Sequence, residues 1–248
     1  MRFFIEVSYK GTNYAGFQIQ ENALTIQQEL EKALQVFYKR TIKLTGSSRT
    51  DSGVHALQNY FQMDEGLELL PAQVYNLNAI LPGDIVIKRI FEVSSELHCR
   101  FHALHRSYQY HIYQKKDPFL ADRAWHYPYP VDVNLLNEAA AILREYNDFS
   151  SFSKRNTQTF TKLCTIMQSE WVMENDVLVY KVKANRFLRG MVRALVATQL
   201  LVGRKKISTD QFRAIIEAKS CEKANFAAPA HGLFLMEVAF AENAFDNR

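Results

Sequence analysis

Cysteine is scarce in this chain of 248 residues, which holds only Cys99, Cys164 and Cys221. The three lie far apart and form no Cys-x-x-Cys pair, and such a sparse, odd set suits a reducing compartment. Long apolar runs are also missing, since none approaches the ~20 residues that cross a membrane. The first acid, Glu6, comes too early for a secretory signal peptide. We therefore expect a soluble cytoplasmic protein with no membrane partner.

The motifs that bind nucleotide cofactors are absent as well. Neither Gly-x-Gly-x-x-Gly nor Gly-x-x-x-x-Gly-Lys occurs, and there is no Gly-x-Ser-x-Gly nucleophile elbow. The segment His98–His105 carries three histidines and Cys99, but it has no second cluster at ligand spacing. Strand alternation would also point these side chains to different faces. We therefore expect neither a nucleotide cofactor nor a metal ion.

Acidic residues are lacking from one long segment, between Asp176 and Asp210. Eight cations lie within it: Lys181, Lys183, Arg186, Arg189, Arg193, Arg204, Lys205 and Lys206. We expect the first two lysines to share a face of a strand, and Arg186, Arg189 and Arg193 to form one stripe on a helix. Such a run is usually a solvated basic face. Because no acid neutralises it here, we favour binding of a polyanion through its phosphates.

Charge is also unevenly distributed along the chain. Residues 1–103 hold 10 Lys and Arg against 11 Asp and Glu, whereas residues 104–248 hold 20 against 15. The formal net charge of the whole chain is only +4. We therefore expect a polyanionic partner to contact mainly the second half, and we do not expect indiscriminate coating of nucleic acid.

Hydrophobic periodicity predicts an α+β protein. We expect strands at Phe3–Tyr9, Val54–Met63, Ile85–Val93, Tyr108–Tyr113, Cys164–Met173, Val177–Ala184 and Leu233–Phe240. We expect helices at 25–39, 71–80, 133–146, 187–202 and 209–219. The two halves repeat one layout, which favours mostly antiparallel sheets with helices packed on one side. The expected domains are residues 1–100 and 101–248, without a Pro- or Gly-rich linker between them.

What the chain does contain is a short polar turn, Ser47–His55, with Asp51 near its middle. Arg49 precedes the aspartate by two residues, and Gly53 follows it by two. A cation can keep a carboxylate ionised, hydroxyls can orient it, and a glycine lets backbone or ligand approach closely. This setting suits a carboxylate nucleophile. Most Ser-rich turns with an Asp only turn the chain, so the turn alone does not decide its role.

A second feature is the aromatic-rich strand pattern Arg106–Tyr113. Alternation puts Tyr108, Tyr110 and Ile112 on one face. Such a face is commonly part of a core. It can also offer a flat ring on which an unstacked base lies, with the hydroxyl still able to form a hydrogen bond.

Separate motifs continue along nearly the whole chain. They are Tyr9-x-Gly11-Thr12-x-Tyr14-x-Gly16-Phe17-Gln18-x-Gln20, Gly46-x-x-Arg49-Thr50-Asp51-x-Gly53-Val54-His55-Ala56, Asn78-Ala79-x-Leu81-Pro82-Gly83-Asp84-Ile85, His98-x-Arg100-Phe101, Arg106-x-Tyr108-x-Tyr110, Asn185-x-Phe187-Leu188-x-x-Met191-Val192-Arg193 and Ala230-x-Gly232-Leu233-x-Leu235. In this order they resemble the tRNA pseudouridine synthase A family. Ser47, Ser48 and Ser52 depart from the small residues usual in that family, and Arg189-Gly190 replaces a pair that is often His-His.

The resemblance implies that Asp51 is the nucleophile that converts uridine to pseudouridine at positions 38 to 40 in the anticodon arm of tRNA. Arg49 or Arg193 would keep Asp51 ionised. Tyr108 would stack on the flipped base and take or relay the proton from C5, and Leu233 would line the base pocket. Basic side chains would bind the phosphates of the anticodon stem, and these contacts would position the RNA without recognising its sequence. The remaining substrate-binding residues are His55, Lys181, Lys183, Arg186 and Arg189.

The resemblance also implies a homodimer. No cofactor is expected, because the isomerisation is redox-neutral. For the fold as a whole, we expect the halves to pack rigidly, with a continuous central sheet and an active-site cleft between them.

Two other classes of function compete with this interpretation. A non-catalytic RNA-binding module also fits an α+β sheet with surface aromatics, but an anion beside RNA phosphates would then be a liability. A nucleoside hydrolase or retaining glycosidase acting through Asp51 generally needs a second carboxylate. No second acid lies near the turn, and a small-molecule enzyme has no need of eight uncompensated cations.

Overall fold

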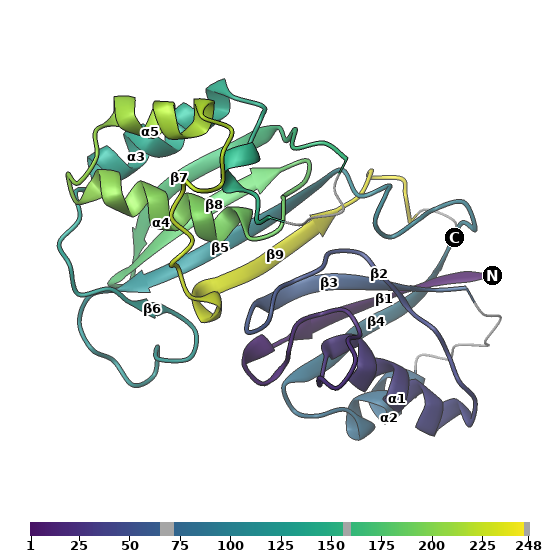
Figure 1. Ribbon diagram of the computed structural model, residues 1–248. Coiled ribbons are helices and arrows are strands. Elements are labelled where there is room, and N and C mark those ends of the chain that lie inside the picture. The colour runs from purple at the N-terminus through teal and green to yellow at the C-terminus, as the bar shows by residue number, and fades with distance from the viewer. Residues whose placement is uncertain (65–71, 156–159, 246–248) are drawn as a thin grey trace. The chain divides into compact units, whose positions relative to one another are not determined.

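The computed structural model describes residues 1–64, 72–155 and 160–245, and Figure 1 shows its ribbon. In these ranges the chain forms nine β-strands and five α-helices, which confirms the predicted α+β class. The chain divides into two compact units. Unit 1 comprises Met1–Leu104 and Phe234–Arg248, and unit 2 comprises His105–Leu233.

The sheet of unit 1 has the strand order β4-β1-β3-β9, and a short strand, β2, pairs with β3. Its strands are β1 (Arg2–Tyr9), β2 (Thr45–Gly46), β3 (His55–Met63), β4 (Ile85–Val93) and β9 (Leu233–Ala239). β1 is antiparallel to both β3 and β4, whereas β9 runs parallel to β3 and pairs Phe234 with His55. Parallel neighbours need a crossover connection, and the chain between these two strands includes all of unit 2.

Helices α1 (Ile26–Tyr38) and α2 (Ala72–Ile80) cover one face of this sheet (Figure 1). The hydroxyl of Thr25 caps α1 by accepting the backbone N–H of Gln28 at 3.3 Å. The helix ends where Lys39 takes a left-handed conformation. Its buried residues recur at helical spacing: Ile26, Leu30, Ala33 and Leu34. The helix predicted at 25–39 is confirmed.

An aromatic cluster brings the end of the chain onto unit 1. The buried ring of Phe4 lies 5.6 to 6.2 Å, centroid to centroid, from those of Tyr60, Phe91, Phe240 and Phe245. Burial of such large rings is strongly favourable, so the segment after β9 packs here. The predicted domains, 1–100 and 101–248, missed this return because a strand pattern does not show which half it joins.

Unit 2 has a sheet in the order β5-β8-β7, with a short strand, β6, parallel to β5. Its strands are β5 (His105–Tyr113), β6 (Trp125–His126), β7 (Ile166–Glu174) and β8 (Val177–Ala184). β7 and β8 form the predicted hairpin. Asn175 and Asp176 turn the chain with φ of 46° and 64°, as a two-residue hairpin turn requires. The two-residue strands β2 and β6 carry no periodicity and were not predicted.

Three helices lie together on one face of this sheet (Figure 1): α3 (Val133–Ile142), α4 (Met191–Gly203) and α5 (Thr209–Glu217). Asp132 caps α3 through its carboxylate, and Ser208 caps α5 in a capping box. After α3 the chain forms a 3-10 turn at Leu143, so the α-helix ends before the predicted Tyr146.

The start of α4 also differs from the prediction. Periodicity favoured a helix over 187–202, but Gly190 has a φ of 73° and precedes the first helical residue. L-residues rarely adopt this φ, and a Cβ at Gly190 would lie 3.1 Å from Cγ of Lys154. Arg186 and Arg189 therefore lie before the helix, and the predicted stripe of three arginines on one helix is wrong.

Candidate active site

The loop that carries Asp51 (residues 47–54, the Asp51 loop) is bonded to the backbone of residues 14–17. The N–H of Phe17 donates to the carbonyl of Thr50 at 3.1 Å. The carbonyl of Tyr14 accepts twice, from the N–H of Gly53 at 3.3 Å and from the hydroxyl of Ser52 at 3.1 Å. These bonds fix the backbone on both sides of Asp51, whose side chain is partly buried.

Gly16 lies at the closest approach of the two segments. Its φ is 114°, and a Cβ there would be 3.0 Å from the carbonyl oxygen of Thr50. Both facts favour glycine at this position. The carbonyl of Gly16 also accepts the N–H of Ile26, the first residue of α1, at 3.1 Å. Through residues 14–17, the Asp51 loop is thereby connected to the start of α1.

A buried polar network lies beneath the loop. The side-chain amide of Asn59, which is fully buried, donates to the carbonyl of Ser48 at 2.7 Å and to the hydroxyl of Tyr9 at 3.1 Å. The hydroxyls of Tyr9 and Thr50 are 2.9 Å apart. Burial raises the pKa of Tyr9 far above its usual value, so the hydroxyl stays protonated. We did not single out Tyr9 or Asn59 from the sequence, although Tyr9 opens the first of the quoted motifs.

His55 follows the loop and is only 2% exposed. Its Nδ1 accepts the backbone N–H of Gly11 at 3.1 Å, and its ring stacks on that of Phe234 at 4.6 Å. Because Nδ1 is an acceptor, the ring carries a proton on Nε2. The structure therefore places His55 as a buried support between β3 and β9, and its contact with substrate stays a prediction.

Arg49 is exposed and lies near a second cation, Arg100. Partial burial and the positive charge of Arg100 lower the pKa of Arg49. Arg49 forms no ion pair with Asp51 or any other acid in the part of the chain that the structure describes. Of the two arginines proposed to keep Asp51 ionised, Arg49 is therefore the less supported.

In unit 2, β5 presents the predicted face of Tyr108, Tyr110 and Ile112, all of them buried. The ring of Tyr108, 9% exposed, meets that of Phe187 edge to face at 5.0 Å. The hydroxyl of Tyr110 donates to the carbonyl of Pro229 at 2.8 Å. Burial raises the pKa of Tyr110 well above its usual value, so this donor is permanent.

Tyr110 is also the point where two other candidates meet. Arg193 lies in the first turn of α4, and its charge opposes the rise in the pKa of Tyr110. The Nε of Arg193 donates to the carbonyl of Ala228 at 2.6 Å, which fixes the guanidinium. A Cβ at Gly232, next to the buried Leu233, would be 2.8 Å from the Tyr110 ring. Unit 2 thus gathers the Tyr108 strand, Arg193 and the segment before Leu233.

The basic run is less uniform than its sequence suggests. Lys181 and Lys183 share a face of β8, as predicted. However, Nζ of Lys181 lies 2.5 Å from a carboxylate oxygen of Glu174, and Nζ of Lys205 lies 3.5 Å from one of Asp132. These acids are distant in sequence or lie just outside the run, so the premise of eight uncompensated cations is wrong.

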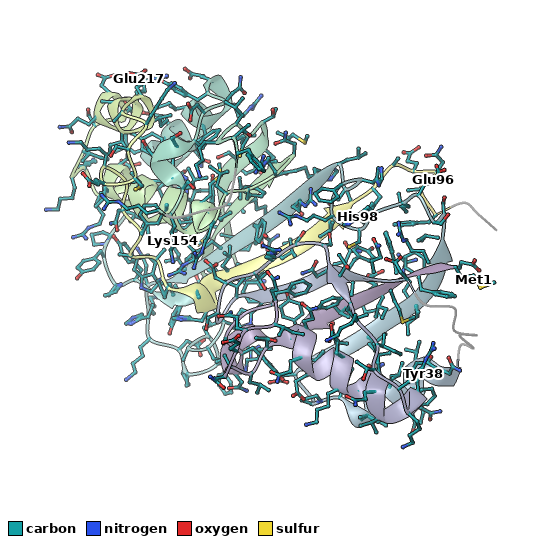
Figure 2. The ribbon with its side chains drawn as sticks, turned by 45° about the vertical axis from the view of Figure 1, so that its right-hand side comes forward. Met1, Tyr38, Glu96, His98, Lys154 and Glu217 are labelled. Atoms are coloured by element: carbon teal, nitrogen blue, oxygen red, sulfur yellow. The ribbon has the colours of Figure 1, made fainter. Side chains whose placement is uncertain are left out.

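Two other cations of the run, Arg186 and Arg189, lie just before α4. Arg189 is exposed, and Arg186 donates from Nη1 to the hydroxyl of Thr161 at 3.3 Å. The backbone N–H of Lys154, labelled in Figure 2, donates to the carbonyl of Arg189 at 3.0 Å. Arg204–Lys206 lies at the other end of α4, about 20 Å away along a helix that rises ~1.5 Å per residue.

Two of the three histidines in residues 98–105 accept backbone N–H groups. Nδ1 of His102 accepts the N–H of His98 at 2.8 Å, and Nδ1 of His98 accepts the N–H of Arg100 at 3.0 Å. Among the described residues no group of His, Cys, Asp and Glu could hold a metal ion. Nor does any described helix have the length and apolar character needed to cross a membrane.

Known proteins resemble this chain over most of its length. The family model for tRNA pseudouridine synthase matches residues 5–102 and 139–241, which include the Asp51 loop and α4 but not Tyr108. A tRNA pseudouridine synthase A from Parabacteroides distasonis is 42% identical over 246 residues, 98% of each chain. One from Bacteroides fragilis is 42% identical over 99% of this chain and 98% of its own. One from Staphylococcus aureus (strain MRSA252) is 38% identical over 98% and 93%.

Proposed function

Because the chain belongs to the tRNA pseudouridine synthase family, we propose that it modifies uridines 38 to 40 in the anticodon arm of tRNA, with Asp51 as the nucleophile. Family membership makes the chain an isomerase that converts uridine to pseudouridine in tRNA. The residue assignment is supported above all by the fixed backbone of the Asp51 loop. A carboxylate that must meet one substrate atom benefits from such preorganisation.

The proposed chemistry exchanges one glycosidic bond for another. The bond between uracil N1 and ribose C1′ breaks, and the Asp51 carboxylate captures the oxocarbenium-like C1′. The freed uracil turns so that C5 faces C1′. The C5–C1′ bond then forms as the carboxylate leaves, C5 loses its proton and N1 gains one. No atom or electron is gained or lost overall, so the reaction needs no oxidant or reductant.

Residues of unit 2 take the other proposed roles. Tyr108 stacks on the uracil, and Leu233 lines the apolar side of the base site. Arg193 keeps Asp51 ionised in this proposal, and the hydrogen bond from its Nε to the carbonyl of Ala228 limits the motion of its guanidinium group. Arg49 faces a second cation and is the weaker candidate for this role.

The basic side chains around β8 and the start of α4 are proposed to bind the phosphates of the anticodon arm. Each cation that neutralises a phosphate releases counterions, and this release favours binding. We propose that Lys183, Arg186 and Arg189 contribute most to it. Lys181 contributes less because Glu174 already neutralises it. His55 remains a proposed substrate-binding residue, and its contacts with Gly11 and Phe234 hold its ring in place.

The function is tested by mapping pseudouridine in unmodified tRNA transcripts incubated with the protein. We expect new pseudouridine at 38, 39 or 40 and nowhere else. Modification confined to other positions would refute the proposed site. Release of free uracil would instead indicate a glycosidase, and binding without any change in the RNA would indicate a non-catalytic RNA-binding module.

We propose two further properties, a homodimer and a cytoplasmic location. The homodimer rests on the family resemblance, whereas the location rests on the sparse cysteines of the sequence. Light scattering on the purified protein should then give twice the chain mass of 28.7 kDa. A monomer at micromolar concentration would contradict the dimer.

A further inference from the structure

Phe101 in unit 1 exposes 73% of its surface, although rings of this size are usually buried. It is flanked by two polar side chains. The ring of His98 lies 4.4 Å from it, centroid to centroid, and the guanidinium carbon of Arg100 lies 5.6 Å from its centroid. An exposed ring beside a cation is the kind of surface on which single-stranded RNA bases stack.

The backbone under this ring is anchored to the Asp51 loop. Cys99 is fully buried, and its carbonyl accepts the hydroxyl of Ser47, in the loop, at 2.5 Å. The N–H of Cys99 donates to the side-chain carbonyl of Gln62 at 3.1 Å, and its thiol donates to the carbonyl of Thr45 at 3.3 Å. The adjoining Arg100 and Phe101 are therefore held beside the loop. Because this backbone is already ordered, RNA binding loses little free energy to ordering it.

Two cations meet at the same place. The charge of Arg100 is close enough to lower the pKa of Arg49, so the two guanidinium groups repel each other. Arg49 has no acidic partner among the described residues. A phosphate would relieve this repulsion, because it accepts hydrogen bonds from both guanidinium groups. His98, labelled in Figure 2, has its pKa lowered by partial burial and by nearby cations, so its ring is neutral at pH 7 and can pack on Phe101.

We propose that Phe101 and Arg100, with Arg49, form an RNA-binding surface beside the Asp51 loop. A tRNA base other than the target uridine stacks on Phe101, and an adjoining phosphate binds between the two arginines. The inference rests on the proposed function, since it supposes that tRNA is the ligand. It adds to that function a contact in the half of the chain that has no excess of positive charge.

The surface is tested by the affinity of an unmodified tRNA transcript for Phe101 variants, all built on Asp51→Asn to prevent turnover. We expect Phe101→Ala and Phe101→Leu to weaken binding by about tenfold, since neither keeps a ring for stacking. Phe101→Trp should stay within about twofold of the parent, because indole stacks as well as phenyl. Tyr75→Ala, which removes a ring of unit 1 that is 79% exposed, should change nothing.

Arg100→Ala supplies a second readout. We expect it to weaken binding and to lower the slope of log affinity against log salt by about one, as loss of one phosphate contact does. On the background that keeps Asp51, Phe101→Ala should raise KM and leave kcat nearly unchanged. The melting temperature of each variant, compared with that of the parent, shows whether the variant is still folded.

Three outcomes separate this inference from the proposed function. Equal affinity of parent, Phe101→Ala and Arg100→Ala would overturn the surface even if pseudouridine is formed. Weak binding by Phe101→Leu, retained binding by Phe101→Trp and a reduced slope for Arg100→Ala would support it. If the Phe101 and Arg100 variants behave in this way but no pseudouridine forms, the RNA-binding surface is supported and the proposed sites of modification are refuted.

Discussion

Unit 1 and unit 2 share a layout, a mostly antiparallel sheet with helices on one face, but they use polar side chains differently. In unit 1, Tyr9 and Asn59 are buried and bond to each other and to Thr50 and Ser48 of the Asp51 loop, and the buried His55 accepts the backbone N–H of Gly11. In unit 2, cations such as Arg186 and Arg189 lie at the surface. A nucleophile must be placed to a fraction of an ångström, whereas phosphate binding needs charge more than exact position.

This contrast predicts two kinds of variant. Changes beneath the Asp51 loop should reduce stability and turnover, whereas changes to the surface cations of unit 2 should reduce affinity and its salt dependence. The contrast would be wrong if a change beneath the Asp51 loop altered only tRNA affinity, or if a change to a surface cation of unit 2 reduced stability and turnover.

Among variants that keep every proposed catalytic residue, the largest effect is expected from Gly16→Ala. The new Cβ would lie 3.0 Å from the carbonyl oxygen of Thr50 at a φ of 114°. Such strain costs about 1–3 kcal/mol of unfolding free energy. Displacement of Asp51 should also lower turnover by up to about 100-fold. Urea denaturation and pseudouridine formation measure the two. Gly83→Ala, where a Cβ meets nothing within 4 Å, is the matched control. Equal behaviour of the two variants would contradict the tie between Gly16 and the loop.

A smaller effect is expected from Arg189→Ala in unit 2. This exposed side chain has no acidic partner among the described residues, so its loss should weaken tRNA binding severalfold and lower the salt slope by about one. Lys181→Ala should do less, because Glu174 already neutralises that lysine. Binding titrations at several salt concentrations compare them. A larger loss for Lys181→Ala would invert the assignment of phosphate contacts.

The smallest effect is expected from the titration of His98 in unit 1. Partial burial, with Arg2, His102 and Arg100 nearby, lowers its folded pKa below 6.5, and the charge of Asp64 only partly opposes this. The neutral ring therefore stabilises the fold above pH 6.5, and this contribution is lost as the pH falls through the lower folded value. The melting temperature of the wild type should fall slightly relative to that of His98→Gln between pH 6.5 and 5. Parallel curves would show that His98 does not titrate in this way.

Much of the fold follows from local periodicity, because the responsible residues are neighbours on one element. The buried positions of α1 and the alternation of Tyr108 and Tyr110 on β5 are examples. The start of α4 could not be predicted in this way. Its apolar spacing continues back to Phe187, and only the positive φ of Gly190 shows that the helix has not yet begun.

The contacts around the candidate residues could not be predicted from the sequence. Asp51, Arg49 and Arg193 stand out by motif and charge. That Arg49 has Arg100 as a neighbour depends on the bond from Ser47 to Cys99, which joins residues 52 positions apart. The ion pair between Lys181 and Glu174 likewise forms only because a hairpin folds β7 onto β8.

The central claim is that Asp51 acts as the nucleophile. The most direct measurement compares pseudouridine at positions 38 to 40 of unmodified tRNA after incubation with wild type or Asp51→Asn, together with the tRNA affinity of each. We predict no pseudouridine above background for Asp51→Asn and an affinity within about twofold of the wild type, since the carboxylate makes bonds in the reaction and not in binding. Substantial turnover by Asp51→Asn would contradict the account.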